Sequence, residues 1–164
     1  PVGNVGNFYD VFVCVANFSD SVGVAGVEFG IDYNAATGQG IDIFDWTRCG
    51  DLEFPSTGWP QSGTGEIVTW VSNQNCTETH QALRVVGRFY IGVYTPDRFA
   101  LTPRPVTGRV KVADCAASED DLTNNAQSPL GFADFGTGIG YNPCLNVVPT
   151  VGTTWGGLKS LYSR

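Results

Sequence analysis

The segment Val22–Tyr33, which reads VGVAGVEFGIDY, constrains the fold of this chain more than any other. Its apolar side chains alternate with glycine and acidic residues, so Val27, Phe29 and Ile31 share one face of an extended strand. A period of two predicts a β-strand with one buried face and one solvent-facing face. An apolar run precedes this segment and ends in a polar turn, so we predict that the two strands pair as an antiparallel hairpin through Ser19–Gly23.

A later run, Leu83–Tyr94, shows the same alternation. It is predicted to be a long strand whose apolar face closes a core over Phe29 and Ile31. The residues on the apolar faces of these runs are predicted to be mostly buried. They are Val13, Val27, Phe29, Ile31, Val85, Phe89, Ile91 and Val112.

The composition predicts an all-β fold. The 164 residues include 21 glycines and 9 prolines, and Val, Thr, Phe and Tyr fill the runs between them, as expected of many short strands joined by turns. We predict a two-sheet antiparallel β-sandwich of the immunoglobulin-like or jelly-roll type, stapled by disulfides. The predicted divisions are an N-terminal extension at 1–7, a single sandwich domain at 8–152 and a C-terminal docking tail or short helix at 153–164.

The charge balance limits the classes of partner. Nine basic residues against sixteen acidic ones give a formal charge of −7, and the Arg and Lys residues are scattered, which argues against nucleic acid and anionic membrane. No apolar run approaches the roughly 20 residues that span a bilayer, so membrane insertion is not expected. Because the chain begins at Pro1 and contains no methionine, we expect a product that has lost a leader peptide and acts outside the cell or on its surface.

The five cysteines lie far apart and form no CxxC pair, which argues against zinc or thioredoxin-like chemistry. Disulfides in an oxidising compartment are the better interpretation. The predicted bridges join Cys49 to Cys76 and Cys115 to Cys144, because these pairs tie the two long irregular regions. Cys14 is predicted to remain reduced in a strand.

Two sequons, at Asn17 and Asn75, match the N-glycosylation pattern. The pattern is short enough to occur by chance. If the sites are used, they agree with a secreted chain.

No catalytic motif stands out. The single histidine, His80, lies in a polar loop without a G-x-S-x-G elbow, so we predict that the protein is not an enzyme and needs no cofactor. The acidic run Ala117–Asn125 offers oxygen ligands of the kind that calcium prefers but lacks EF-hand spacing, so calcium is an alternative to a solvated turn. Trp46, Trp59 and Trp70 are candidates for a carbohydrate platform, with Trp59 on a surface loop and Trp70 in the core.

The order of the strands resembles that of the cohesin-like β-sandwich modules of secreted bacterial proteins, over roughly residues 8–114. Those modules carry a Gly-apolar-x-Phe-x-apolar-x-Tyr strand near their start, matched here by Gly26, Val27, Phe29, Ile31 and Tyr33. The resemblance implies a sandwich that acts as an extracellular binding module. The chain departs from the pattern in its five cysteines and in Asn34-Ala35, where an Asp-Pro is usual, which argues against dockerin recognition and leaves the sandwich intact.

Our leading functional prediction is a secreted structural protein, the repeating subunit of an extracellular filament or surface layer. The first residues can extend as a strand onto the sheet edge of the next subunit, which would assemble the protein head-to-tail. The predicted assembly residues are Pro1, Val2, Val5, Trp155, Leu158 and Tyr162. One alternative is that both ends fold back on their own domain, and another is an extracellular binding module for a carbohydrate or a protein.

Overall fold

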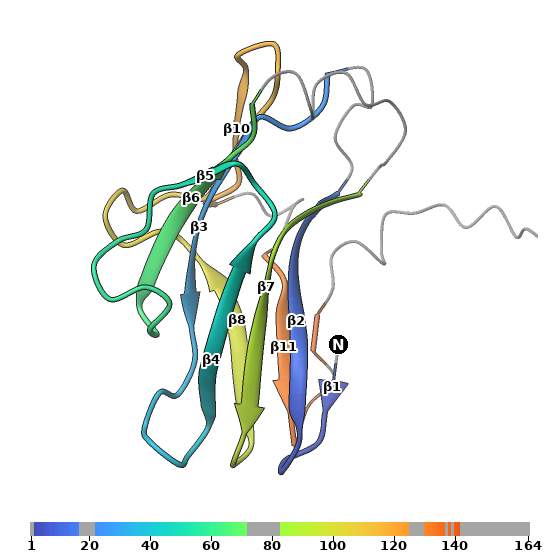
Figure 1. Ribbon diagram of the computed structural model, residues 1–164, viewed down its shortest axis with the longest axis vertical. Coiled ribbons are helices and arrows are strands. Elements are labelled where there is room, and N and C mark those ends of the chain that lie inside the picture. Colours follow the sequence, from blue (N-terminus) through green and yellow to red (C-terminus); the bar gives the residue numbers. More distant parts are fainter. Residues whose placement is uncertain are drawn as a thin grey trace, which may run out of the picture.

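The computed structural model describes residues 2–16, 22–71, 83–124, 130–136, 138, 140 and 141. In this part of the chain every regular element is a β-strand, and the strands form two sheets that pack face to face (Figure 1). The predicted all-β, two-sheet sandwich is therefore confirmed. The predicted C-terminal helix, with Trp155, Leu158 and Tyr162, lies outside the described residues.

The larger sheet has the order β1-β11-β8-β3-β6-β5, and β9 adds to β3 while β10 pairs with β9. Its strands are β1 (Val2–Gly3), β3 (Gly26–Asp32), β5 (Leu52–Glu53), β6 (Thr64–Thr69), β8 (Asp97–Thr102), β9 (Lys111–Ala113), β10 (Glu119–Asp121) and β11 (Phe132–Phe135). The smaller sheet has the order β2-β7-β4, made of β2 (Phe8–Ala16), β7 (Leu83–Val93) and β4 (Ile41–Arg48). Between the described strands, all pairings are antiparallel except that of β1 with β11.

The predicted hairpin between the first two long strands is wrong. β2 pairs with β7 in the smaller sheet, whereas β3 pairs with β6, β8 and β9 in the larger sheet. Alternation predicts which face of a strand is buried, but it does not determine which strand pairs with it. Here β2 and β3 lie in opposite sheets, and both bury their apolar faces in the core between the sheets. The connecting Ser19–Gly23 turn lies largely outside the described residues.

The core lies between the sheets, as predicted. Six of the eight residues expected inside are buried: Val13, Val27, Phe29, Ile31, Phe89 and Ile91. The other two, Val85 and Val112, are only partly buried. A β-bulge places Val13 opposite Gly87 and Cys14 opposite Val85, so the extra residue, Val86, takes the fully buried position.

The second face of β3 is not solvent-facing as predicted. Residues 26–31 are all buried, and only Asp32 at the end of β3 is exposed. The segment Pro103–Arg109, here called the cover segment, crosses the outer side of β3. A Cβ atom added to Gly30 would lie 2.6 Å from the carbonyl oxygen of Pro103, so the missing side chain makes room for the cover segment.

The described part of the N-terminus pairs within its own chain. Val2 and Gly3 form β1, which runs parallel to Asp134 and Phe135 of β11. This arrangement matches the alternative in which the end folds back on its own domain, and it does not support strand donation to a neighbouring subunit. Of the predicted assembly residues, Val2 is exposed and Val5 lies beside Gly136, while Pro1 lies outside the described residues.

The predicted bridge between Cys49 and Cys76 is wrong, because Cys49 is a free and exposed thiol. Backbone hydrogen bonds, rather than a disulfide at Cys49, hold the region after β4 against β6. Asp51 N donates to Thr69 O at 2.9 Å, and Phe54 N donates to Ile67 O at 2.8 Å.

No bridge joins two described cysteines. Cys115 is disulfide-bonded, but its partner lies outside the described residues, so the pairing with Cys144 stays a prediction. Cys14 is half-buried in β2. The sequons at Asn17 and Asn75 also lie outside the described residues.

Candidate functional site

Three aromatic rings meet on the outer face of the smaller sheet. Phe8 of β2, Phe44 of β4 and Tyr90 of β7 have ring centroids 5.7 to 5.9 Å apart. Their exposed fractions are 57%, 52% and 39%. We call this cluster the aromatic face. Solvent-facing positions of a strand are usually polar, so a cluster of exposed rings is a candidate contact surface.

Local backbone geometry explains how the rings come together. Phe8 and Tyr90 point outward because of the alternation of β2 and β7, whereas Phe44 sits at a β-bulge between Ile43 and Asp45. Gly92 lies beneath them: a Cβ atom there would be 2.8 Å from the Phe44 ring and 3.1 Å from the Phe8 ring. Because Gly92 has no side chain, the rings of Phe8 and Phe44 can pack directly against the backbone of β7.

Charged side chains border the rings. Arg88 of β7 lies between two carboxylates, 3.3 Å from Asp10 of β2 and 3.5 Å from Asp45 of β4. Phe12 of β2 is exposed and extends the apolar surface on the same side of the strand. Apolar groups with a polar rim are typical of protein–protein contact surfaces.

The predicted tryptophan platform is not formed. The Trp46 and Trp59 rings pack edge-to-face 5.5 Å apart, and both contact Phe29 and Phe89 of the core. Trp59 is therefore a partly buried core residue rather than the surface residue that we predicted. Trp70 packs against the core as predicted, and its Nε1 donates to Cys49 O at 3.1 Å.

A pair of carboxyl groups lies between the sheets. Glu66 of β6 is fully buried, and neither of its carboxyl oxygens has a hydrogen-bond partner among the described residues. Burial, and to a smaller extent the nearby Glu53 carboxylate, raise the pKa of Glu66 to about 8. Glu53 accepts hydrogen bonds from Trp46 Nε1 and Arg48 Nη1, each at 3.2 Å. Glu66 is thus a neutral acid at pH 7, sealed from solvent, and it offers a substrate no access.

The acidic run at residues 117–125 forms β10 and the turn after it as far as the structure describes it. Lys111 Nζ lies 2.5 Å from Glu119, and Asp121 accepts a hydrogen bond from Thr123 N at 3.0 Å. Among the described residues no group of three or more His, Cys, Asp or Glu side chains is placed to hold a metal ion. His80 lies outside the described residues.

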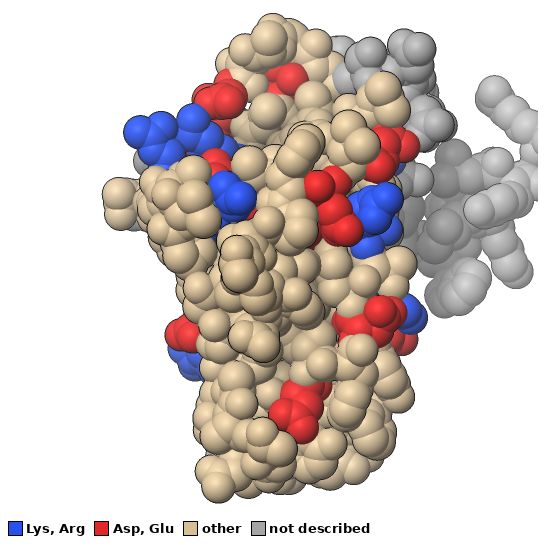
Figure 2. All heavy atoms as spheres, turned by 60° about the vertical axis from the view of Figure 1, so that its left-hand side comes forward, with Lys and Arg blue, Asp and Glu red and all other residues tan. Residues whose placement is uncertain are grey.

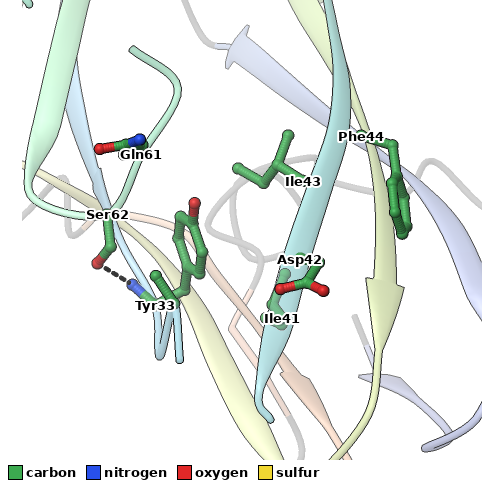
Figure 3. A pocket seen from close by; sticks show the side chains of 8 residues that line it. Tyr33, Ile41, Asp42, Ile43, Phe44, Gln61 and Ser62 are labelled. Atoms are coloured by element: carbon green, nitrogen blue, oxygen red, sulfur yellow. Dashed lines mark hydrogen bonds between the residues drawn. The ribbon is translucent and has the colours of Figure 1, made fainter. Parts of the chain in front are cut away.

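A pocket of about 490 Å³ opens beside β4, at the side of the sandwich (Figure 3). We call it the edge pocket. Figure 3 shows Ile43 pointing toward Tyr33 and Gln61, while Phe44 leaves the opposite side of β4. Tyr33 N donates to Ser62 Oγ at 3.0 Å, and Tyr33 Oη donates to Pro60 O at 3.2 Å. The lining residues are Tyr33, Ala35, Ile41, Asp42, Ile43, Phe44, Gln61 and Ser62.

Charged side chains of both signs are scattered over the face of the molecule in Figure 2, and they form no continuous basic stripe there. In the described part of the chain, no helix is long and apolar enough to cross a membrane.

Comparison with known proteins shows a likeness of fold. No protein-family model matches the sequence, and no curated protein matches it. The structure is similar to a cohesin module of a family 33 glycoside hydrolase from Clostridium perfringens, at 13% identity and a TM-score of 0.53, covering 82% of this chain and 87% of that module.

Two cohesins solved in complex with dockerins are also similar. The sixth cohesin of scaffoldin B from Acetivibrio cellulolyticus is 11% identical with a TM-score of 0.53, covering 82% of this chain and 92% of that one. A type I cohesin from Clostridium thermocellum is 8% identical with a TM-score of 0.50, covering 82% and 87%. This chain therefore has a cohesin-like β-sandwich fold.

Proposed function

We propose that this protein is an extracellular, non-catalytic protein-binding module whose partner docks on the aromatic face. The observation that carries the proposal is the cluster of Phe8, Phe44 and Tyr90, whose rings contact one another and remain exposed on a paired sheet. Aromatic residues and arginine dominate the energetics of protein interfaces, and Arg88 lies beside this cluster.

The geometry suits binding without a large ordering cost. All three rings stand on strands of one sheet, and β7 pairs with both β2 and β4. Contacts between the rings already restrict their rotamers, so less side-chain entropy is lost when a partner covers them. Burying this much aromatic surface contributes several kcal/mol, at about 25 cal/mol per Å².

We infer that the partner is a protein of the dockerin kind, against the expectation drawn from Asn34-Ala35, which follow β3 and are not part of the aromatic face. The support is the cohesin-like fold, because two of the similar structures are cohesins in complex with dockerins. The filament interpretation has less support, since β1 already pairs with β11 of its own chain. Carbohydrate binding through the tryptophans has less support too, since Trp46 and Trp59 pack into the core.

Calorimetric titration against a panel of purified dockerins tests the proposal. We expect at least one dockerin to bind, and the double variant Phe8→Ala/Tyr90→Ala to weaken that binding by at least about thirtyfold, because each truncated anchor costs about 1 kcal/mol or more. The matched control is Leu52→Ala/Phe54→Ala, which removes two similarly exposed apolar side chains from the region of β5.

The control variant should bind as the unchanged protein does. Two results would contradict the proposal. One is that no dockerin binds at about 0.1 mM, the weak end of useful affinities. The other is that the Leu52/Phe54 variant loses binding while the Phe8/Tyr90 variant keeps it.

A further inference from the structure

Among the described residues, β4 has an unpaired edge, because it is the last strand of the smaller sheet and its one strand partner there is β7. Its hydrogen-bond register can be read from the residue that precedes it. Tyr94 N donates to Gly40 O at 2.8 Å, so these two residues form a hydrogen-bonded pair. Such pairs alternate along an antiparallel ladder, so the next one joins Asp42 to Gly92.

Ile41 and Ile43 therefore turn their backbone groups away from β7, toward the free edge. A hydrogen bond on that side supports this orientation: Ile41 N donates to Asn34 O at 3.1 Å. Among the described residues no strand continues that pairing along Ile43. A backbone donor and acceptor on an open edge are the groups that an added strand uses.

The edge pocket lies beside this stretch. Ile41 and Ile43 of β4 and the ring of Tyr33 form its apolar part (Figure 3). Side chains of an extended segment alternate in direction, so a strand paired along Ile43 would point every second side chain toward the pocket. The volume of about 490 Å³ exceeds that of a single apolar side chain, and the pocket opens to solvent.

The surroundings are acidic. Asp42 lines the pocket, Asp32 accepts a hydrogen bond from Ser62 Oγ at 2.8 Å, and Asp97 accepts one from Asn34 N at 2.9 Å. No lysine or arginine is among the lining residues. Burial raises the pKa of the Tyr33 phenol, and the carboxylates of Asp42 and Asp97 act in the same direction. Positive side chains on a bound segment therefore complement this edge.

We propose that the free edge of β4 at Ile43, together with the edge pocket, binds an extended basic segment of the partner by strand addition. The inference rests on the proposed protein binding and names a second contact of the same partner, next to the aromatic face through Phe44. The bulge after Ile43 interrupts the edge, so only a short stretch pairs and the segment alone binds weakly.

The test uses the full, isotope-labelled chain and a capped octapeptide of alternating lysine and valine. The matched control peptide replaces every lysine by glutamate and keeps the backbone and the valines. We expect the lysine peptide to shift the amide signals of Ile43 and Ser62 and to slow exchange of the Ile43 amide at least about tenfold at saturation. The glutamate peptide should bind at least about tenfold more weakly, because like charges repel at the contact.

Two variants separate the charge from the backbone contact. Asp42→Lys should weaken binding of the lysine peptide about tenfold and strengthen binding of the glutamate peptide. Ile43→Pro removes the edge donor without touching a ladder bond to β7 and should abolish binding of the lysine peptide. The readout for this variant is loss of the Ser62 amide shift, because proline has no amide hydrogen. If a thermal melt shows that the Ile43→Pro variant is unfolded, binding of the two peptides to the Asp42→Lys variant tests the inference.

Equal binding of the two peptides would overturn the inference. So would signal shifts that map to the aromatic face, or no binding at all. The peptide titration needs no natural partner, so the two proposals fail separately. If the peptide fails and a dockerin still binds, only the edge contact is wrong. If every dockerin fails and the peptide binds at Ile43, only the aromatic-face proposal is wrong.

Discussion

The outer faces of the two sheets use glycine in the same way, with opposite results. On the larger sheet, Gly30 leaves a space that the cover segment fills. On the smaller sheet, Gly92 leaves a space that the rings of Phe8 and Phe44 fill. In the first case the chain closes its own surface, whereas in the second it presents aromatic groups to solvent. A glycine inside a strand therefore marks a place where something packs on the sheet, and the packing group decides whether the face is covered or free to bind.

The two faces also differ in how they hold charge. Beneath the cover segment, Glu28 is nearly buried, lies 3.5 Å from Arg104 and accepts a hydrogen bond from Thr107 Oγ at 2.6 Å. Arg104 also donates to Phe54 O at 3.2 Å, which ties the cover segment to the region after β5. On the aromatic face, Arg88 and its carboxylate partners are all substantially exposed. Charges on the first face stabilise the fold, and those on the second remain available to a partner.

The largest effect should come from the core that supports both faces. Phe29→Ala removes a fully buried ring that contacts Trp46 and Trp59, so we expect the free energy of unfolding to fall by about 3 to 5 kcal/mol. Urea denaturation measures the change. Phe8→Ala is the matched control, and it should lower stability by less than about 1 kcal/mol because its ring is exposed. A cost at Phe8 equal to that at Phe29 would mean that the aromatic face is structural.

A second large effect should appear when the pH changes. The pKa of Glu66 is about 8 in the folded protein, against an ordinary value of 4.5, so the folded state keeps a proton that the unfolded state releases. Between these values stability should fall as the pH rises, by up to about 1.4 kcal/mol per pH unit. Glu66→Gln should remove this slope in urea titrations across the same range. A wild-type stability that is constant from pH 5 to 8 would show that Glu66 is ionised in the core.

A smaller loss of stability should follow when the ion pair beneath the cover segment of the larger sheet is broken. Arg104→Met keeps the side-chain length but leaves Glu28 without its nearly buried ion-pair partner, so we expect a loss of about 3 kcal/mol. Exchange of backbone amides in β3 should become faster as the cover segment loosens. If stability and exchange both stay unchanged, the cover segment is not held by this pair.

The smallest change in stability should come from an arginine-to-methionine substitution on the aromatic face. Arg88→Met breaks two exposed ion pairs, which together contribute less than about 1 kcal/mol. Thermal melts at low and high salt should therefore nearly superimpose for this variant and the unchanged protein. A loss as large as that of Arg104→Met would remove the distinction between the two faces.

Period-two patterns were enough to predict the sandwich and most of its core, because Phe29, Ile31, Phe89 and Ile91 lie on strands whose alternation persists. They did not identify strand partners, since pairing depends on contacts between distant segments. The patterns also did not predict the β-bulges, which change the direction of the side chains at Val86 and Phe44 and leave no mark in the local amino-acid composition. Alternation along the sequence places Tyr90 on the opposite face from Phe89 and Ile91, but only the fold brings the Phe44 ring beside it.

The most direct measurement of the central claim is side-chain footprinting by hydroxyl radicals, with and without a bound dockerin. The account predicts that oxidation of Phe8, Phe44 and Tyr90 falls at least about fivefold in the complex, as these exposed rings become covered. Oxidation of Phe54 and Val106, which are 53% and 68% exposed and do not belong to the smaller sheet, should not change. Protection of Phe54 and Val106, with Phe8 and Tyr90 still oxidised, would contradict the account and place the partner on the larger sheet.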